Sequence, residues 1–213
     1  MRIFLRDELM NDIPDWNEIQ RYLRGTWRMM NGHADGLEEL DFSEDGFWQS
    51  FHAITISLPP LILGWIVFAN DLVALRPGTG SRLSIIGSAA FIDLASWVLP
   101  LVIVALLARP LGIVKRFSPY VVATNWGSAI GAWLTVPATL VRMLFPDWPT
   151  LIGSMSMMVY ALIIVFTYRL VHVALKKPYI WSATFFIAFI IGSILMVITF
   201  QNALGIAMPS VSG

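Results

Sequence analysis

The sequence has no cysteine and few charged residues. Among its 213 residues, only 13% are Asp, Glu, Lys or Arg, about half of the roughly 25% that is usual in soluble domains. The absence of Cys excludes disulfides, thiolate metal sites, iron–sulfur clusters and a cysteine nucleophile. A hydrophobic fraction of 57% and a mean hydropathy of +0.70 exclude a disordered chain and argue against a soluble globule.

The sequence also lacks the short motifs that mark common enzymes. It has no HExxH zinc motif, no GxSxG nucleophile elbow and no Walker loop. Its three histidines are scattered, without the spacing of paired metal ligands. A GxG between Arg76 and Arg82 follows no predicted strand, so we interpret it as a tight turn between helices. We therefore predict no catalytic residue, no cofactor, no metal and no nucleic-acid partner.

What the chain has in abundance is long apolar runs. A helix needs roughly 20 apolar residues to cross a bilayer, and five stretches meet this length with apolar residues on all faces. These stretches are about 52–72, 83–108, 119–144, 151–173 and 180–204. The sequence therefore predicts an all-α polytopic membrane protein. A five-helix transmembrane bundle over 51–213 follows an amphipathic, acidic N-terminal head over 1–50.

Charge is distributed unevenly along the chain. Residues 1–50 carry five Lys/Arg and eleven Asp/Glu, whereas residues 51–213 carry nine and three. With five spans, eleven of the basic residues fall on the side of the head and three on the other side. The positive-inside rule then predicts a cytoplasmic N-terminus and a C-terminus on the outer side of the membrane.

The head contains a predicted amphipathic helix over residues 15–30. A capping-box pattern marks its start, and apolar residues recur at helical spacing at Trp16, Ile19, Leu23 and Trp27. We favour an interfacial helix, with this face among lipid headgroups and the arginines on anionic lipid. The alternative is a helix docked on a partner protein or on the chain's own loops. The acidic segment 31–41 predicts a solvated connector, followed by a helix that Ser43 caps.

Asp93 is the one acidic residue predicted near the bilayer midplane. A charge at this depth costs several kcal/mol, so the side chain should face protein or water, or be protonated. Counting depth along the second and third spans places a group of polar and aromatic residues near the same level: Ser96, Trp97, Asn125, Trp126 and Ser128. Asp93 either binds a proton or a solute in a polar pocket, or fixes helix packing through hydrogen bonds.

The third span also carries a small-xxx-small pattern. Ala123, Gly127 and Gly131 recur every four residues, a spacing that lets two helices approach closely. The pattern predicts a packing face toward a helix of the same chain or of a second copy.

A resemblance to a known family rests on two stretches. One is Phe47-Trp48-Gln49-Ser50-Phe51-His52-Ala53 with the later Pro59-Pro60, and the other is Tyr120-Val-Val-Ala-Thr-Asn125-Trp126. With the predicted topology, they resemble the Yip1-like membrane proteins and small proteobacterial inner-membrane proteins grouped with them. The resemblance implies a bacterial inner-membrane protein with a cytoplasmic head, five spans, a periplasmic C-terminus and no catalytic residues. The Asp-Leu-x-Gly-Pro signature of the eukaryotic trafficking members is missing, so their GTPase-partner role is not implied.

Two functions follow from the sequence as hypotheses. The first is a non-enzymatic inner-membrane interaction, scaffold or membrane-organising subunit, whose partners are the lipid bilayer and a membrane protein or a second copy. The second is a small transporter or channel subunit that uses Asp93 at the midplane, where transporters place their sites.

Overall fold

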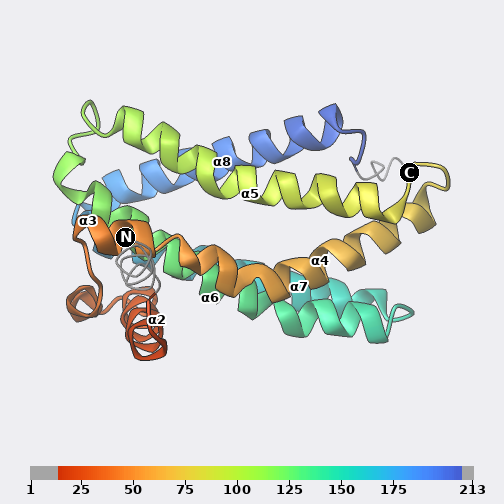
Figure 1. Ribbon diagram of the computed structural model, residues 1–213, viewed down its shortest axis with the longest axis horizontal. Helices are drawn as coiled ribbons and strands as arrows, with labels where there is room; N and C mark the ends of the chain where they lie inside the picture. The colour runs from red at the N-terminus through yellow and green to blue at the C-terminus, as the bar shows by residue number, and fades with distance from the viewer. Residues whose placement is uncertain (1–13, 208–213) are drawn as a thin grey trace, which may run out of the picture.

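The computed structural model describes residues 14–207, and this part of the chain is helical throughout, without a strand (Figure 1). The head comprises α2 (Trp16–Met30), the 3-10 helix η1 (Ala34–Glu39) and α3 (Glu44–Gln49). The long helices are α4 (His52–Leu75), α5 (Arg82–Leu107), α6 (Phe117–Leu144), α7 (Pro149–Leu175) and α8 (Tyr179–Ala203), with the short η2 (Val114–Arg116) before α6. The predicted all-α fold is confirmed.

Helices α4 to α8 are each long and apolar enough to cross a membrane. Their bounds agree with the five predicted spans to within three residues at every end. The chain therefore has the architecture of a multi-pass membrane protein. Four prolines lie inside these helices: Pro59 and Pro60 in α4, Pro100 in α5 and Pro137 in α6.

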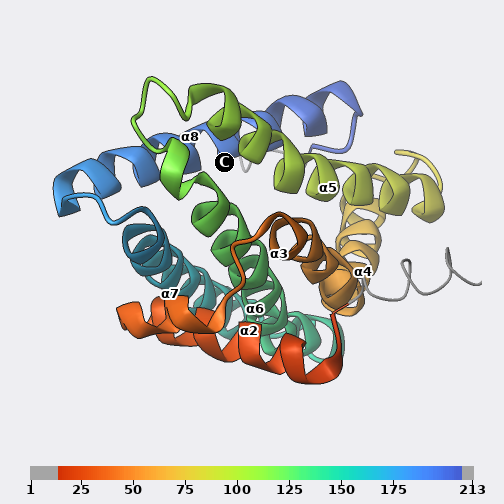
Figure 2. The same ribbon diagram turned by 60° about the vertical axis from the view of Figure 1, so that its left-hand side comes forward.

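The five long helices form two layers (Figures 1 and 2). In one layer α6 packs between α4 and α7, and in the other α5 lies beside α8. Contacts of α4 with α5 and of α7 with α8 join the layers along their two sides. We call the end that carries α2 the head end, and the end with the α4–α5 and α6–α7 loops the far end.

Helix α2 lies across the head ends of α6 and α7 (Figure 2). Asp15 and Glu18 form the predicted capping box at its start. The face buried against the bundle is formed by Tyr22, Gly25, Thr26, Met29 and Met30. Helix α2 thus docks on the transmembrane helices of its own chain, because these five residues form one face that packs against α6 and α7. From the sequence, the surfaces expected for this helix were lipid headgroups, a partner protein or the chain's own loops.

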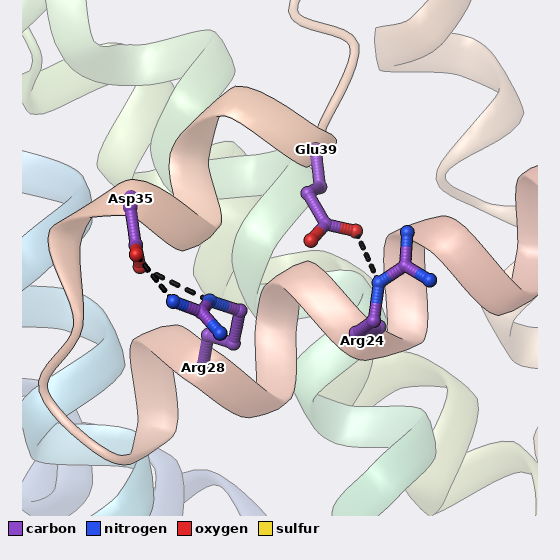
Figure 3. Close-up of polar contacts among 4 residues, drawn as sticks. All are labelled: Arg24, Arg28, Asp35 and Glu39. Carbon is purple, nitrogen blue, oxygen red and sulfur yellow. Dashed lines mark hydrogen bonds and ion pairs between the residues drawn. The ribbon is translucent and has the colours of Figure 1, made fainter.

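The acidic segment after α2 is packed, which differs from the predicted solvated connector. Its η1 helix folds back along α2, and a Cβ added to Gly36 would lie 2.3 Å from the carbonyl oxygen of Gly25. Two ion pairs join the segments: Arg24 Nε lies 2.7 Å from Glu39 Oε2, and Arg28 pairs with Asp35 (Figure 3). The arginines assigned to lipid therefore neutralise the neighbouring acids. Downstream, Ser43 caps α3 as predicted, accepting a hydrogen bond from the Gly46 amide.

Two titratable groups of the head are shifted by this packing. Hydrogen bonds from the Arg28 guanidinium lower the pKa of the Asp35 carboxyl, and the same pairing raises the pKa of Arg28. Burial of Tyr22 between α2 and the bundle raises the pKa of its hydroxyl. The Arg28–Asp35 pair therefore favours the folded head wherever Asp35 is ionised.

Candidate functional site

Asp93 lies near the middle of the 26-residue α5. The Trp65 indole of α4 donates a hydrogen bond from Nε1 to Asp93 Oδ2 over 2.6 Å. Within residues 14–207 no ion pair involves Asp93, and no side chain donates to its other oxygen, Oδ1. The indole of Trp65 thus holds Asp93 Oδ2, whereas Asp93 Oδ1 receives no side-chain hydrogen bond within residues 14–207.

A second set of hydrogen bonds lies closer to the head end. The Trp97 indole donates to Asn125 Oδ1 over 2.9 Å, and Asn125 Nδ2 donates to Ser50 Oγ over 2.8 Å. The Ser50 hydroxyl in turn donates to the carbonyl of Phe47 over 2.7 Å. Asn125 and Ser50 are buried. This chain of bonds ties α5 and α6 to the junction of α3 and α4.

Two cavities meet at Asp93. One has a volume of about 300 Å³ and reaches toward Asn125 and Tyr120, and the other has a volume of about 580 Å³ and reaches toward the far end. Both are lined by Asp93, Trp97 and Ser128. All five long helices contribute to the larger cavity, so it lies between the two layers of the bundle. The space beside Asp93 is therefore a central cleft between the two layers.

Hydroxyl groups line this central cleft. Ser96 Oγ is buried and has no hydrogen-bond partner within the described chain, whereas Ser128 is exposed to the cavities. Thr124 and Thr167 satisfy their own hydroxyl hydrogens by donating to backbone carbonyls one helical turn back. Their oxygens remain able to accept, so the wall can offer both donors and acceptors to a polar ligand.

A third cavity extends the cleft to the far end. Its volume is about 220 Å³, and it shares part of its wall with the larger cavity, including Thr135, Thr139 and Tyr160. It ends at an ion pair in which Arg142 Nη2 lies 2.6 Å from Asp71 Oδ2. The three cavities therefore follow one another from the level of Asn125 to the far end, while the Trp97–Asn125–Ser50 bonds lie at the head end.

The structure brings together most of the predicted polar residues. Ser96, Trp97, Asn125 and Ser128 line the 300 Å³ cavity together with Asp93. Trp126 does not: its ring is fully buried on the opposite side of α6, with its centroid 5.3 Å from that of Tyr22. The α-helical rotation between neighbouring residues separates Asn125 from Trp126, although both lie at the same depth.

The small residues of α6 face the same chain. A Cβ on Gly127 would lie 3.0 Å from Leu170 of α7 and 3.2 Å from Met30 of α2, whereas at Gly131 the nearest atom is 3.9 Å away, on Ile163 of α7. Ala123 is buried. The packing face predicted from these residues thus lies against α7 and the head helix.

The predicted apolar face of α2 is divided. Ile19 and Leu23 are partly buried against the chain's own core, while Trp16 is 67% exposed and Trp27 is 43% exposed. One edge of Trp27 meets Phe166 of α7. The two tryptophans therefore remain available at the surface, whereas the aliphatic residues do not.

Sequence reasoning missed several members of the site. Trp65 is absent from the residues that depth along the spans selected, although counting α4 from the head end places it at the depth of Asp93. Ser50 was placed in the head, and Tyr160, Thr167 and Gln201 lie in α7 and α8, which carry no charged residue at mid-depth. Depth matching could have found Trp65, but only packing of the two layers selects the others.

Comparison with known proteins adds no relative: no protein-family model, no curated protein and no solved structure matches this chain. The functional argument therefore rests on the geometry of the central cleft. Residues 14–207 also hold no group of three or more His, Asp or Glu side chains that could bind a metal ion.

Proposed function

We propose that this chain is a non-enzymatic membrane protein that binds a small solute at Asp93 and carries it across the bilayer, as a small transporter or channel subunit. The observation that supports this proposal is the meeting of two cavities, lined by all five long helices, at Asp93, the only carboxyl near the middle of a long helix within residues 14–207. Transporter sites lie near the bilayer midplane between helices. A carboxyl kept only for packing would be expected to have its polar partners close around it.

The proposed setting is a bacterial inner membrane with the head in the cytoplasm. Under this orientation, the Trp97–Asn125–Ser50 bonds lie on the cytoplasmic side of Asp93 and the cavities extend toward the periplasm. The geometry then corresponds to a state that is closed on the cytoplasmic side. Conduction of the solute would require these bonds to separate.

Access of water to the cleft tests the proposal, and the natural absence of Cys allows single thiols to be placed at will. Ser128→Cys puts a thiol in both cavities, and Ala161→Cys puts one on α7 at an exposed position that lines neither cavity. N-ethylmaleimide reacts with thiols that meet water. In native membranes we expect the thiol at 128 to react at least about ten times faster than that at 161, since thiolates form poorly in lipid.

Equal and slow reaction at both positions would contradict the proposal, because it would mean that the cleft is dry. Protein purified from each strain should elute as the same species on gel filtration, which checks that both variants fold.

A second function, an interaction or membrane-organising subunit, is favoured by the exposed aromatic residues of the head. Trp16 and Trp48 are 67% and 63% exposed, and such rings prefer membrane interfaces or partner surfaces. Purification in mild detergent should then yield a stoichiometric partner or a homo-oligomer. A clean monomer, with no binding of the head to lipid vesicles, would contradict this second function.

A further inference from the structure

The two cavities that meet at Asp93 carry charge of one sign only. Asp93 is the single charged side chain that lines the 300 Å³ and 580 Å³ cavities, and no Lys, Arg or His lines either of them. Ion pairs among the described residues occur in the head and at the far end, away from Asp93. An ionised carboxylate at this depth is costly unless a positive charge neutralises it, so the cleft is electrostatically suited to a cation.

Aromatic rings from several helices line the two cavities that meet at this carboxyl. Trp65 and Trp97 come from α4 and α5, and Tyr160 and Phe189 come from α7 and α8. Aromatic faces attract ammonium groups, most strongly where water is excluded. Rings and a single carboxylate are a poor substitute for the oxygen shell that a hard metal cation requires, but they match a cation with alkyl or aryl substituents.

Polar groups beside Asp93 can complete the contacts of such a ligand. Ser96 Oγ is buried without a partner, and Asp93 Oδ1 receives no hydrogen bond from residues 14–207. An N–H or a polar substituent of the ligand could satisfy either atom. The cavity volumes of about 300 and 580 Å³ suit a small organic molecule.

We propose that the solute is a small monovalent organic cation, an alkyl- or arylammonium, whose charged nitrogen pairs with Asp93 between the Trp65 and Trp97 rings. This inference rests on the proposed function, because it requires that solutes enter the cleft from water. It adds the charge and the chemical class of the ligand.

Charged thiol reagents test whether the electrostatic potential of the cleft attracts cations. In the Ser128→Cys background we compare rates with a trimethylammonium-ethyl methanethiosulfonate and a sulfonatoethyl methanethiosulfonate. The ratio of the two rates should be at least about ten times higher with Asp93 present than in Asp93→Asn, since a charged cleft concentrates ions of opposite sign. Asp147→Asn is the matched control: it removes an exposed acid at the far end that lines none of the three cavities and should leave the ratio within about twofold.

Competition tests the chemical class. Tetramethylammonium chloride should slow labelling of the 128 thiol by N-ethylmaleimide in the presence of Asp93, and equal sodium chloride should not. Asp93→Asn should abolish this protection, expressed for each variant as the ratio of the labelling rates without and with tetramethylammonium. Elution of the variant as the same species on gel filtration checks that it folds.

The outcomes separate the two proposals. Suppose that N-ethylmaleimide labels the thiol at 128 but Asp93→Asn does not change the ratio of the rates with the ammonium and sulfonate reagents. The cation inference would then be overturned, and the cleft would remain a water-filled one. The same conclusion would follow if the ammonium reagent did not react at 128. Absence of any labelling at 128 would overturn the proposed function itself. Protection by sodium chloride equal to that by tetramethylammonium would replace the organic cation with an inorganic one and so overturn the inference.

Discussion

Trp65 sets the position of the Asp93 carboxyl. Its indole Nε1 lies 2.6 Å from Asp93 Oδ2, and the Trp65 side chain is only 8% exposed. Trp carries a single N–H donor and no acceptor, so it can hold a carboxylate or a protonated carboxyl oxygen without competing for a ligand's N–H. The bond leaves Oδ1 directed to other partners, which is what a ligand-binding acid requires.

Trp65→Phe should therefore destabilise the protein through Asp93. Loss of the donor leaves a partly buried acceptor unpaired, at an expected cost of about 1–2 kcal/mol, measured by unfolding in mixed detergent and SDS micelles. In the Asp93→Leu background the same change should cost less, with a coupling energy of about 0.5–2 kcal/mol. Trp148→Phe, at an exposed ring, should change stability by less than about 0.5 kcal/mol. Additive effects of the two site changes would mean that the bond contributes nothing.

At the scale of elements, the head is a folded unit built on close backbone contact. Gly25 of α2 and Gly36 of η1 face each other, and a Cβ on either would lie within 2.7 Å of the other's carbonyl oxygen. The Arg24–Glu39 and Arg28–Asp35 pairs flank this contact (Figure 3). The α2–η1 unit is thereby held as one body against α6 and α7.

Gly36→Ala should loosen this unit. The added methyl group meets backbone atoms that cannot move without separating η1 from α2, a form of overpacking that typically costs about 1–3 kcal/mol. Trypsin should then cleave at the arginines of α2 several times faster than in the unaltered protein. Gly87→Ala, where the methyl group meets nothing within 4 Å, serves as control. Unchanged cleavage in Gly36→Ala would show that the contact is not needed for docking.

Acid should loosen the same unit through Asp35. Its pKa is lowered in the folded protein by the Arg28 guanidinium, so the stabilisation is complete above the unfolded value of about 3.9 and is lost as the pH falls through the lower folded value. Hydrogen-exchange protection of α2 should decrease over that interval, and Asp35→Asn should show reduced protection at neutral pH with a weaker pH dependence. Glu38→Gln, at an exposed acid outside the ion pairs of the described chain, should behave as the unaltered protein. If hydrogen-exchange protection of α2 depended on pH in Asp35→Asn as it does in the unaltered protein, this role of Asp35 would be contradicted.

The spans and helix caps could be predicted from the sequence, whereas the packing of the head could not. Hydropathy placed all five spans to within three residues, because lipid imposes one length and one composition on each of them. The capping residues Asp15 and Ser43 were equally readable, since caps act locally. The docking of η1 on α2 was not predicted from the sequence. Charged residues in the 31–41 segment indicate a solvated segment, and only the fold shows that Arg24 and Arg28 lie opposite them.

The site was predictable in part for the same reason. Depth along a span brought Asn125 and Ser128 to Asp93, because rise per residue is fixed. Depth does not specify which face of a helix meets the cleft, so Trp126 was included and Trp65 was left out. The contributions of α7 and α8 depend on how the two layers pack, and no local pattern encodes that arrangement.

At the scale of the whole molecule, the two-layer arrangement creates a cleft that closes at one end. The head end carries the Trp97–Asn125–Ser50 bonds and α2, with Met30 lining the cavity beside Asp93. The far end carries the third cavity and the Asp71–Arg142 pair. Asymmetry of this kind is what an alternating-access protein displays in one of its states.

Five spans and the charge bias predict that the two termini lie on opposite sides of the membrane. Alkaline phosphatase fused after residue 207 should be active in the periplasm, and a fluorescent protein fused at the N-terminus should fluoresce in the cytoplasm. Fusions to the α4–α5 loop should report the periplasm, and fusions near η2 the cytoplasm. Both termini on one side would contradict the five-span topology.

The central claim is that the chain moves a small cation through a site at Asp93, and charge displacement measures this directly. Proteoliposomes on a solid-supported membrane are exposed to jumps in the concentration of methyl-, tetramethyl- and benzylammonium chloride, each against equal sodium chloride. We predict a saturable current for at least one ammonium ion in the unaltered protein, reduced at least about tenfold in Asp93→Asn but retained in Asp147→Asn, whose acid lines none of the three cavities. Absence of current with all three ions, or equal currents with and without the Asp93 carboxylate, would contradict the account.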